Sequence, residues 1–300
     1  MALLPTTLEG TTTRERATPR RRIGTQNVLA MAVLFVATVY FLVPVYWLVI
    51  NATKSSNDII DSFGLWFSSW NLGANLHDLF TTQNGIYVRW LVNTAIYAFG
   101  SAILGTLFSA MAGYALAKYI FPGRNLIFSI ILSALLVPAT ALALPLFLLL
   151  SKAGLTNTIW SVLLPQIASP FGVYLARIYA AASVPDDLLD AARVDGLGEF
   201  RTFFTVATRI MAPALVTVFL FQFVAVWNNY FLPLIMLQDP SLYPLTLGLQ
   251  TLNATSGNSQ QLQYNLVVAG ALISVIPLIV AFLLLQRYWR SGLTAGGVKG

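Results

Sequence analysis

The sequence contains no cysteine and a single histidine, His77. Without cysteine the chain has no disulfides, no iron–sulfur ligands and no thiol chemistry. One histidine cannot by itself build a metal site or a histidine proton relay, and the simplest interpretation of His77 is a surface position in a loop. We therefore expect no bound metal and no catalytic residue.

Charge is also scarce. Only 9% of the 300 residues are charged, whereas 57% are hydrophobic and the mean hydropathy is +0.73. Soluble domains carry roughly 25% charged residues, so the composition predicts a polytopic, all-α protein of the membrane. The net charge of +6 then reflects basic residues kept on the cytosolic side and does not indicate nucleic acid.

The chain divides into a polar N-terminal tail and six apolar runs. Residues 1–27 are rich in Thr and Arg and have too little apolar surface to fold, so we expect a disordered cytosolic tail. Residues 28–289 form the expected transmembrane domain, and residues 290–300 a cytosolic tail. The six expected spans, each near the roughly 20 residues that a bilayer core requires, are Val28–Ile50, Trp90–Ala117, Leu126–Leu150, Ile159–Ala176, Ile210–Leu237 and Leu266–Gln286.

The distribution of basic residues sets the orientation. With the N-terminus in the cytosol, 14 of the 17 Lys and Arg residues fall in cytosolic segments, and only Lys54, Arg89 and Lys152 fall outside. This asymmetry predicts six spans with both termini in the cytosol. The loops at about 51–89 and 238–265 are then extracellular, and the longest cytosolic loop is 179–209.

The six expected spans contain no Asp, Glu, Lys, Arg or His. Proton- and ion-coupled carriers and voltage sensors depend on ionisable groups within the membrane, and an intramembrane hydrolase needs a catalytic set there. The sequence also has no GxxxxGK[ST] phosphate loop. Any energy for transport therefore has to come from another protein.

Loop 179–209 carries signals for a short helix, a glycine turn and a second helix. Ser183 followed by Asp186 resembles a capping box, and Gly196 and Gly198 favour a left-handed backbone that ends a helix. Leu188, Ala191, Ala192 and Val194 are expected on one face. The alternative is an interfacial loop that lies on lipid headgroups.

Polar residues near the end of the fifth span are candidates for a transport pathway. They are Gln222, Trp227, Asn228 and Asn229. Amides offer donors and acceptors to sugar hydroxyls, and an indole ring can stack on a pyranose. The alternative is hydrogen bonding between helices and an aromatic belt, which we prefer for Trp227.

The run Asp190-Ala191-Ala192-Arg193-Val194-Asp195-Gly196 resembles the EAA loop of permease subunits of bacterial ABC importers. Two departures are Asp190 in place of the usual Glu, and Thr208-Arg209 where the family commonly has Leu-Pro. Further motifs narrow the resemblance to carbohydrate-uptake permeases, similar to the second (G-type) permease of the maltose family. They are Ala117-Lys118-Tyr119, Phe121-Pro122-Gly123-Arg124, Gly154-Leu155-Thr156-Asn157-Thr158, Trp227-Asn228-Asn229-Tyr230 and Gly292 to Gly300.

This resemblance implies a type I ABC importer permease fold, with a cytosolic coupling helix between the fourth and fifth spans. It also implies that the EAA residues contact a separate ATPase, and we assign this coupling role to Asp190, Ala191, Ala192, Asp195, Gly196 and Gly198. The tail residues Gly296, Gly297 and Lys299 would insert between ATPase subunits. Loop 238–265 would reach into an extracellular or periplasmic sugar-binding protein.

The implied assembly contains a second permease subunit and an ATPase dimer that binds the ATP and Mg, in a bacterial inner membrane. The chain itself would bind no cofactor. Two alternatives within transport are a permease for a polyol or a glycerol phosphate, and an autonomous secondary carrier. A phosphate ligand would need Arg or Lys in the cavity, and the absence of charge in the expected spans argues against a carrier.

Overall fold

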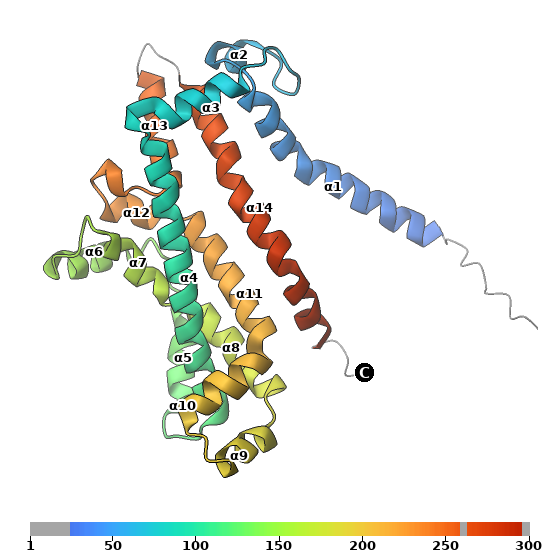
Figure 1. The fold of residues 1–300 in the computed structure, drawn as a ribbon, viewed down its shortest axis with the longest axis vertical. Helices are drawn as coiled ribbons and strands as arrows, with labels where there is room; N and C mark the ends of the chain where they lie inside the picture. The colour runs from blue at the N-terminus through green and yellow to red at the C-terminus, as the bar shows by residue number, and fades with distance from the viewer. Residues whose placement is uncertain (1–24, 259–262, 296–300) are drawn as a thin grey trace, which may run out of the picture. The chain divides into compact units, whose positions relative to one another are not determined.

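The computed structural model describes residues 25–258 and 263–295, and all regular elements in these ranges are helical. The chain divides into two units, residues 1–46 and 47–300. In chain order the elements are α1 (Thr25–Ala52), α2 (Ser56–Asp61), α3 (Leu72–Thr81), η1 (Thr82–Asn84), α4 (Ile86–Lys118), α5 (Arg124–Ala134), α6 (Ala143–Lys152), α7 (Ile159–Ile167), α8 (Pro170–Ser183), α9 (Asp186–Val194), α10 (Glu199–Thr202), η2 (Phe203–Ala207), α11 (Thr208–Trp227), α12 (Phe231–Met236), η3 (Pro240–Leu242), α13 (Leu245–Asn258) and α14 (Tyr264–Ala295) (Figure 1).

The first unit, as far as the structure describes it, is the greater part of α1. This helix begins at Thr25, inside the segment predicted to be a disordered tail, and residues 1–24 lie outside the described range. Large apolar side chains such as Leu34, Phe35 and Phe41 are exposed along it. A helix that is apolar on all sides is typical of a membrane span.

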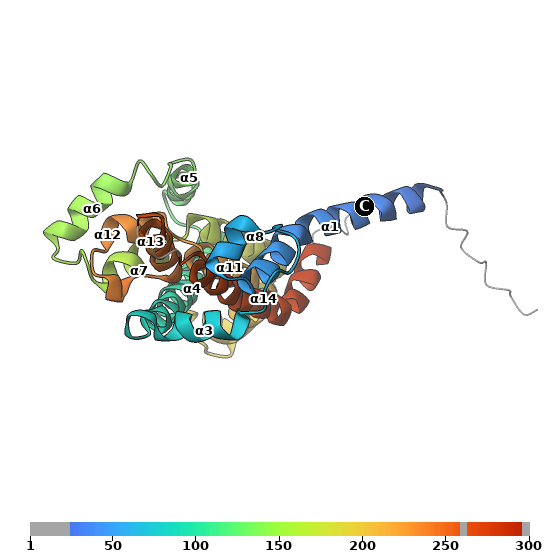
Figure 2. The same cartoon turned by 90° about the horizontal axis from the view of Figure 1, so that it is seen from above.

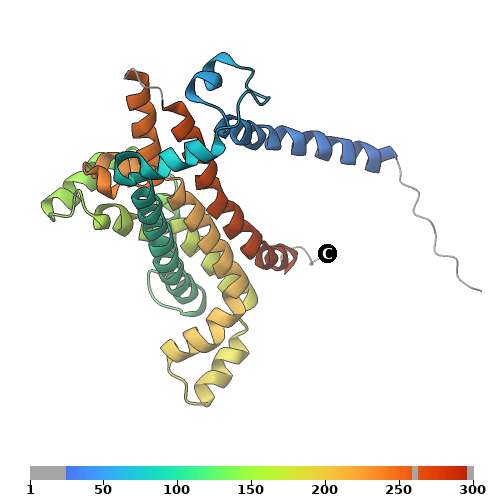
Figure 3. The ribbon, with the colours of Figure 1, turned by 45° about the horizontal axis from the view of Figure 1, so that its top comes forward.

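The second unit is built around α4, which packs against α8 and α11 (Figure 3). Small residues allow this close approach, and Gly113 lies at the contact. A Cβ on Gly113 would lie 2.5 Å from the Cβ of Ala176 and 2.6 Å from the backbone nitrogen of Arg177. Glycine is therefore the residue that lets the backbones of α4 and α8 meet.

Three of the expected spans differ from single continuous helices. The run Leu126–Leu150 is two short helices, α5 and α6, because the chain leaves the helix near Val137, whose successor Pro138 disfavours helical geometry. Viewed along the bundle in Figure 2, α5 and α6 lie at its edge. The fourth run is divided into α7 and α8 at Ser169, whose side chain caps α8 by accepting from Gly172 N at 3.2 Å.

The fifth expected span, Ile210–Leu237, is also interrupted. Helix α11 ends at Trp227, and the short helix α12 follows after a break at Asn228 and Asn229. The described residues thus contain five helices that are long and apolar enough to cross a membrane. They are Val28–Ala52, Ile86–Lys118, Ile159–Ser183, Glu199–Trp227 and Tyr264–Tyr288.

These helices extend beyond the expected spans and contain charged residues that the sequence-based boundaries exclude. Arg177 lies within the α7–α8 segment, and its guanidinium carbon sits 3.6 Å from the ring centre of Phe128 on α5. Arg209 lies near the start of α11. The expected spans, which stop at Ala176 and begin again at Ile210, contain no charged residue, whereas the longer observed helices include both arginines.

We call the end of the second unit that carries α9 the α9 end, and the opposite end, which carries α2, α3 and α13, the α13 end. The loop expected at 51–89 contains α2 and α3, and the loop expected at 238–265 contains α13, so neither is a plain connector. An apolar cluster that includes Trp90, Phe223 and Trp227 fills the middle and the α13 end. A second cluster, with Tyr114, Leu189 and Phe203, underlies the α9 end.

Candidate functional site

The segment between α8 and α11 forms the short helix, turn and second helix that the sequence predicts. Helix α9 ends in a Schellman motif, in which Leu197 N donates to Ala192 O at 2.9 Å and Gly196 N donates to Arg193 O at 3.0 Å. Gly196 has φ +81°, the left-handed conformation that glycine adopts without strain. Gly198 differs from the prediction, because its φ of −72° is ordinary extended backbone at the N-cap of α10.

The start of α9 also differs from the prediction. Ser183 is the last residue of α8 and forms no capping box; Pro185 occupies the N-cap position and makes no side-chain cap. The carboxylate of Asp186 instead pairs with Lys118, as described below. Asp186 and Asp187 still lie in the first turn, where negative charge is favourable.

Three of the four residues expected on one face of α9, namely Leu188, Ala191 and Val194, are exposed together, whereas Ala192 lies on the opposite, buried face. Leu189 and Ala192 are buried against the chain's own second cluster. Leu188, Ala191, Val194 and Asp195 are exposed. The helix is anchored by Leu189, which was not predicted to face inward, because its register is set by packing on α8 and η2. Ala192 is therefore not available on the outer surface.

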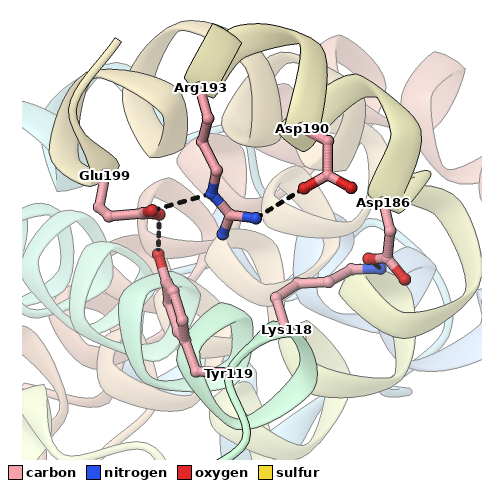
Figure 4. Close-up of polar contacts among 6 residues, drawn as sticks. All are labelled: Lys118, Tyr119, Asp186, Asp190, Arg193 and Glu199. Carbon is pink, nitrogen blue, oxygen red and sulfur yellow. Dashed lines mark hydrogen bonds and ion pairs between the residues drawn. The ribbon is translucent and has the colours of Figure 1, made fainter. Parts of the chain in front are cut away.

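Helix α9 is tied to the end of α4 by Lys118 (Figure 4). The ammonium group of Lys118 donates to Val184 O at 2.6 Å and pairs with Asp186 Oδ1 at 2.8 Å. The side chain of Lys118 is only 7% exposed, so its charge is compensated where water has little access. This contact joins residues 68 positions apart and fixes the start of α9 below α4.

A second tie comes from the next residue, Tyr119, whose hydroxyl donates to Glu199 Oε2 at 2.5 Å. Burial, and then this hydrogen bond, raise the pKa of Tyr119 above its ordinary value. The tyrosine therefore stays neutral and keeps its proton for the carboxylate. The two adjacent residues Lys118 and Tyr119 hold α9 and α10 respectively.

Arg193 connects α9 with α10 across the Gly196 turn. Its Nε donates to Glu199 Oε1 at 3.0 Å, and its NH1 group lies 2.8 Å from Asp190 Oδ1. These contacts, with Glu199 the stronger, raise the pKa of Arg193. All three residues are exposed, so the ion pairs contribute little stability and act mainly to set geometry. Asp190, a predicted coupling residue, is thus engaged within its own loop (Figure 4).

Beside these contacts lies a cavity of about 240 Å³ between α4 and α10. Its walls are Met111, Tyr114, Ala115, Tyr119, Glu199, Phe200 and Phe203. Phe200 is exposed at its edge. After α10 the chain makes a π-helical turn, η2, before α11, and Thr208 Oγ1 donates to Phe204 O at 2.7 Å. The helix therefore continues through Thr208-Arg209 without a proline.

The predicted pathway residues lie near the break between α11 and α12, around a glutamine that the sequence did not single out. Gln166 lies at the end of α7, and its backbone oxygen accepts a hydrogen bond from Gln222 Nε2. Its side-chain Oε1 accepts a second hydrogen bond from Asn229 Nδ2 at 3.0 Å. The Oδ1 of Asn229 accepts from Leu232 N at 3.2 Å and so caps α12. Gln222 also borders a cavity of about 340 Å³ that Ser169 and Phe221 help to line.

The other two pathway candidates have structural contacts. Trp227 is buried in the first cluster and donates its indole N–H to Ser274 O on α14 at 3.1 Å, the helix–helix bonding that we preferred for it. Asn228 is exposed and donates to Val224 O of its own helix at 2.8 Å. The tail residues Gly296, Gly297 and Lys299 lie outside the described residues, and α14 continues to Ala295.

Sequence reasoning missed Lys118, Tyr119, Glu199 and Gln166 as site residues. The dipeptide Lys118-Tyr119 was part of a recognised motif, but nothing in a linear spacing of 68 or 80 residues indicates contact with Asp186 or Glu199. A glutamine next to Pro165 gave no signal of its own. These contacts arise only from the tertiary fold, in which α4 packs against α8 and α7 packs against α4 and α12.

A chain with five helices of this length and hydropathy in its described part is a multi-pass membrane protein. Residues 105–294 match the family model described as "Binding-protein-dependent transport system inner membrane component". The match covers more than half of the 300 residues, and the chain belongs to this family. It is a membrane transport subunit rather than an enzyme.

Several similar proteins are named as permeases of sugar transport systems. The chain is 40% identical to the arabinooligosaccharides transport system permease protein AraQ of Halalkalibacterium halodurans, over 73% of this chain and 77% of that protein. It is 32% identical to the lactose transport system permease protein LacG of Rhizobium radiobacter, over 84% and 89%. Identity is also 32% to the maltodextrin transport system permease protein MdxG of Bacillus subtilis, over 80% and 84%.

Solved structures show the same fold. A crystal structure of a bacterial ABC transporter that imports the acidic polysaccharide alginate contains a chain with a TM-score of 0.77 and 20% identity, covering 91% of this chain and 99% of that one. A second structure, of the alginate transporter with an alginate pentasaccharide-bound periplasmic protein, gives a TM-score of 0.60 at 16% identity, covering 89% and 95%. The chain therefore has the same helical fold as these ABC transporter chains.

Proposed function

We propose that this protein is the permease subunit through which an ATP-driven importer moves a sugar or oligosaccharide into a bacterial cell. The observation that supports the coupling part most strongly is the doubly tied α9–α10 element, held to α4 by Lys118 and Tyr119. A separate ATPase is supported by the absence of a phosphate loop in the sequence. The sugar class is supported by the relatives named for arabinooligosaccharides, lactose and maltodextrin.

In this proposal the exposed face of α9 contacts the ATPase dimer. Leu188, Ala191 and Asp195 are spaced for one helical face and are exposed, whereas Leu189 and Ala192 are not. We therefore keep Ala191, Asp195 and Gly196 as coupling residues and give Asp190 and Ala192 internal roles. Closure of the ATPase dimer would move α9 as one body with α10 and favour one of two transmembrane arrangements.

The proposed topology has both termini in the cytosol, which requires an even number of crossings. The described part of the chain has five long apolar helices, so the α5–α6 pair has to supply the sixth crossing. Helix α5 packs on α8 and α6 packs on α12. In Figure 1, α5 lies toward the α9 end, and α6 lies farther from that end, near the middle of the unit beside α7. A broken helix is tolerated at membrane depth where protein covers it.

The proposed partners are a second permease subunit, an ATPase dimer that binds ATP and Mg, and an extracellular or periplasmic sugar-binding protein. A periplasmic partner is supported by the alginate transporter structure named with such a protein. In the proposed orientation, α13 lies on the outer side with loop 238–265. The tail after Ala295, with Gly296, Gly297 and Lys299, is proposed to contact the ATPase.

The test is reconstitution of the chain with its co-purified subunits and a binding protein, with ATP hydrolysis and sugar uptake measured together. We expect sugar-stimulated ATP hydrolysis, and we expect Ala191→Trp to abolish uptake because it places a bulky ring on the proposed contact face. Uptake by the chain alone, driven by an ion gradient, would contradict the proposal. A phosphorylated polyol as the only stimulating ligand would favour the alternative substrate.

The topology has its own test, because the sequence has no cysteine and every introduced one is unique. Single cysteines at Asn125, in the first turn of α5, and at Ser151, at the end of α6, are labelled in whole cells with a membrane-impermeant maleimide. The proposal expects labelling from outside at Ser151 only. Labelling of both, or of neither, would mean that the α5–α6 pair does not cross.

A further inference from the structure

A cluster of exposed aromatic side chains follows α2 at the α13 end. The eight residues from Phe63 to Trp70, which we call the aromatic segment, include Phe63, Trp66, Phe67 and Trp70. Their exposed fractions are 72%, 65%, 47% and 72%. Trp66 and Trp70 both contact the ring of Phe67, at centroid distances of 6.2 and 6.0 Å. Contiguous exposed apolar surface of this kind marks an interaction site.

The backbone of the aromatic segment is held firmly by buried polar groups. Lys54 is completely buried, and its ammonium group donates to Ser62 Oγ at 2.9 Å and to Phe63 O at 2.8 Å. Asn51 donates to Gly64 O at 2.8 Å. Burying a charged lysine costs free energy, and here the ammonium group is used to hold a backbone carbonyl in place. We infer that the fixed position of Phe63 has a function.

The far side of the aromatic segment is held in the same way. Ser69 Oγ donates to Asp58 Oδ2 at 2.5 Å, and Asn71 N donates to Thr53 O at 2.7 Å. The hydrogen bonds from Ser69 and then Ser55 lower the pKa of Asp58, so this carboxylate is ionised at neutral pH. The segment is therefore presented by a fixed scaffold from both ends.

The scaffold lies where apolar helices end. Asn75 Nδ2 donates to Ala52 O at the end of α1, at 2.9 Å, and its Oδ1 accepts from Asn265 Nδ2 at the start of α14, at 2.8 Å. Ser56 Oγ also lies 2.6 Å from Asn265 Oδ1. One side chain thus joins the ends of two candidate membrane spans, and the aromatic segment is attached at that level. If these helices cross the bilayer, their ends lie near the boundary between the hydrocarbon core and water.

The aromatic segment lacks the basic residues that would bind an anionic partner. Between Lys54 and Arg89 the sequence has no Lys or Arg, and Lys54 is used internally. Attraction to anionic headgroups is therefore not the source of binding. Indole rings combine apolar area with one N–H donor, a combination that is favoured at the headgroup level.

We propose that Phe63, Trp66, Phe67 and Trp70 form a lipid-interface anchor, which inserts into the headgroup region of the bilayer at the α13 end. The occupant is the phospholipid bilayer itself, and the buried Lys54 sets the depth of the anchor by fixing Phe63. This inference depends on membrane insertion of the chain and not on the sugar or the ATPase.

The experiment uses spin labels at Leu65→Cys and Ser68→Cys, which keep all four aromatic residues. Asp61→Cys is the water reference and Leu283→Cys, an exposed position on α14, is the lipid reference. The transporter, with its co-purified subunits, is placed in nanodiscs of phosphatidylethanolamine and phosphatidylglycerol. Collision rates of each label with oxygen and with a water-soluble nickel complex are then compared. We expect labels 65 and 68 to show an oxygen preference between the two references.

Two results would overturn the anchor. Labels 65 and 68 that match the Asp61 reference would place the segment in water. Low collision rates with both reagents in the complex, and high rates in the isolated chain, would mean that a partner protein covers it. In the double variant Trp66→Ser/Trp70→Ser, we expect label 68 to lose its oxygen preference while thermal unfolding stays unchanged.

The role of Lys54 is tested separately with Lys54→Met and Lys54→Arg. Methionine keeps the stem but cannot donate to Ser62 and Phe63, so we expect label 65 to gain mobility and to lose depth. Arginine keeps the charge and donors and should restore part of both. Equal spectra for label 65 in the wild-type and Lys54→Met backgrounds would refute the scaffold role of Lys54. The anchor itself is tested independently by the collision rates with oxygen and the nickel complex.

Discussion

The hydroxyl of Tyr119, one residue past the end of α4, donates a hydrogen bond of 2.5 Å to Glu199 at the start of α10, 80 residues later in the chain. Arg193 binds the other oxygen of the same carboxylate at 3.0 Å. A single carboxylate therefore joins the end of α4, the helix α9 and the helix α10 that continues into α11. In the proposed function, a displacement of α9 would reach α4 and α11 through this group.

The first prediction concerns this hydrogen bond. Tyr119→Phe removes the hydroxyl but keeps the ring contact with Tyr114, which has a centroid distance of 5.8 Å. We expect a stability loss of about 1 kcal/mol, typical of one hydrogen bond, and a several-fold rise in ATP hydrolysed per sugar imported. Tyr174→Phe is the control, because that ring stacks on Phe128 outside the loop. An unchanged ratio in Tyr119→Phe would show that the contact carries no coupling.

The second prediction separates the two glycines of the turn. Gly196 has φ +81° and Gly198 has φ −72°, and an added Cβ would meet no atom within 4 Å at either position. Gly196→Ala should therefore destabilise the loop by about 1 kcal/mol through backbone conformation alone, whereas Gly198→Ala should not. Limited proteolysis of the loop and coupled uptake give the measurements. Equal effects of the two substitutions would contradict the assigned geometry.

The sequence predicted the class of protein well and the detailed helix ends less well. The α4 span and the glycine turn at Gly196 were predictable because each depends on local chemistry, an apolar run and a left-handed residue. The inward face of α9 was not, because burial of Leu189 in place of Leu188 is decided by tertiary packing on α8 and η2. Pro138 itself indicated a possible break, but the long apolar run from Leu126 to Leu150 led to the prediction of a single continuous helix.

The amide group at Gln166 shows a further limit of sequence reasoning. Gln222 and Asn229 were found as polar residues in apolar surroundings, but their shared partner lies 56 and 63 residues away. Hydrogen-bonding capacity is visible in a sequence, whereas pairing depends on which helices meet. The interpretation of Trp227 as a helix–helix contact was correct because a buried indole N–H needs an acceptor.

A third prediction tests the contact between α4 and α8. Gly113→Ala would bring its Cβ to 2.6 Å from the backbone nitrogen of Arg177, which cannot move without shifting α8, so we expect a loss of about 1–3 kcal/mol. Gly100→Ala meets only the flexible Leu163 side chain, at 3.1 Å, and should be close to neutral because alanine also favours the helix. Thermal unfolding in detergent distinguishes them, and equal midpoints would contradict the close approach.

The last prediction distinguishes structure from substrate contact at the break after α11. Asn229 makes side-chain contacts with Gln166 and Leu232 N and is partly buried, whereas Asn228 is exposed and bonds only to Val224 O in the described contacts. Asn229→Ala should therefore lower stability by roughly 1–3 kcal/mol, since it removes the hydrogen-bond partners that Asn229 gives to Gln166 Oε1 and Leu232 N. Asn228→Ala should leave stability unchanged. If Asn228 contacts sugar, its alanine variant will raise the KM for uptake without altering unfolding; an unchanged KM assigns both amides to structure.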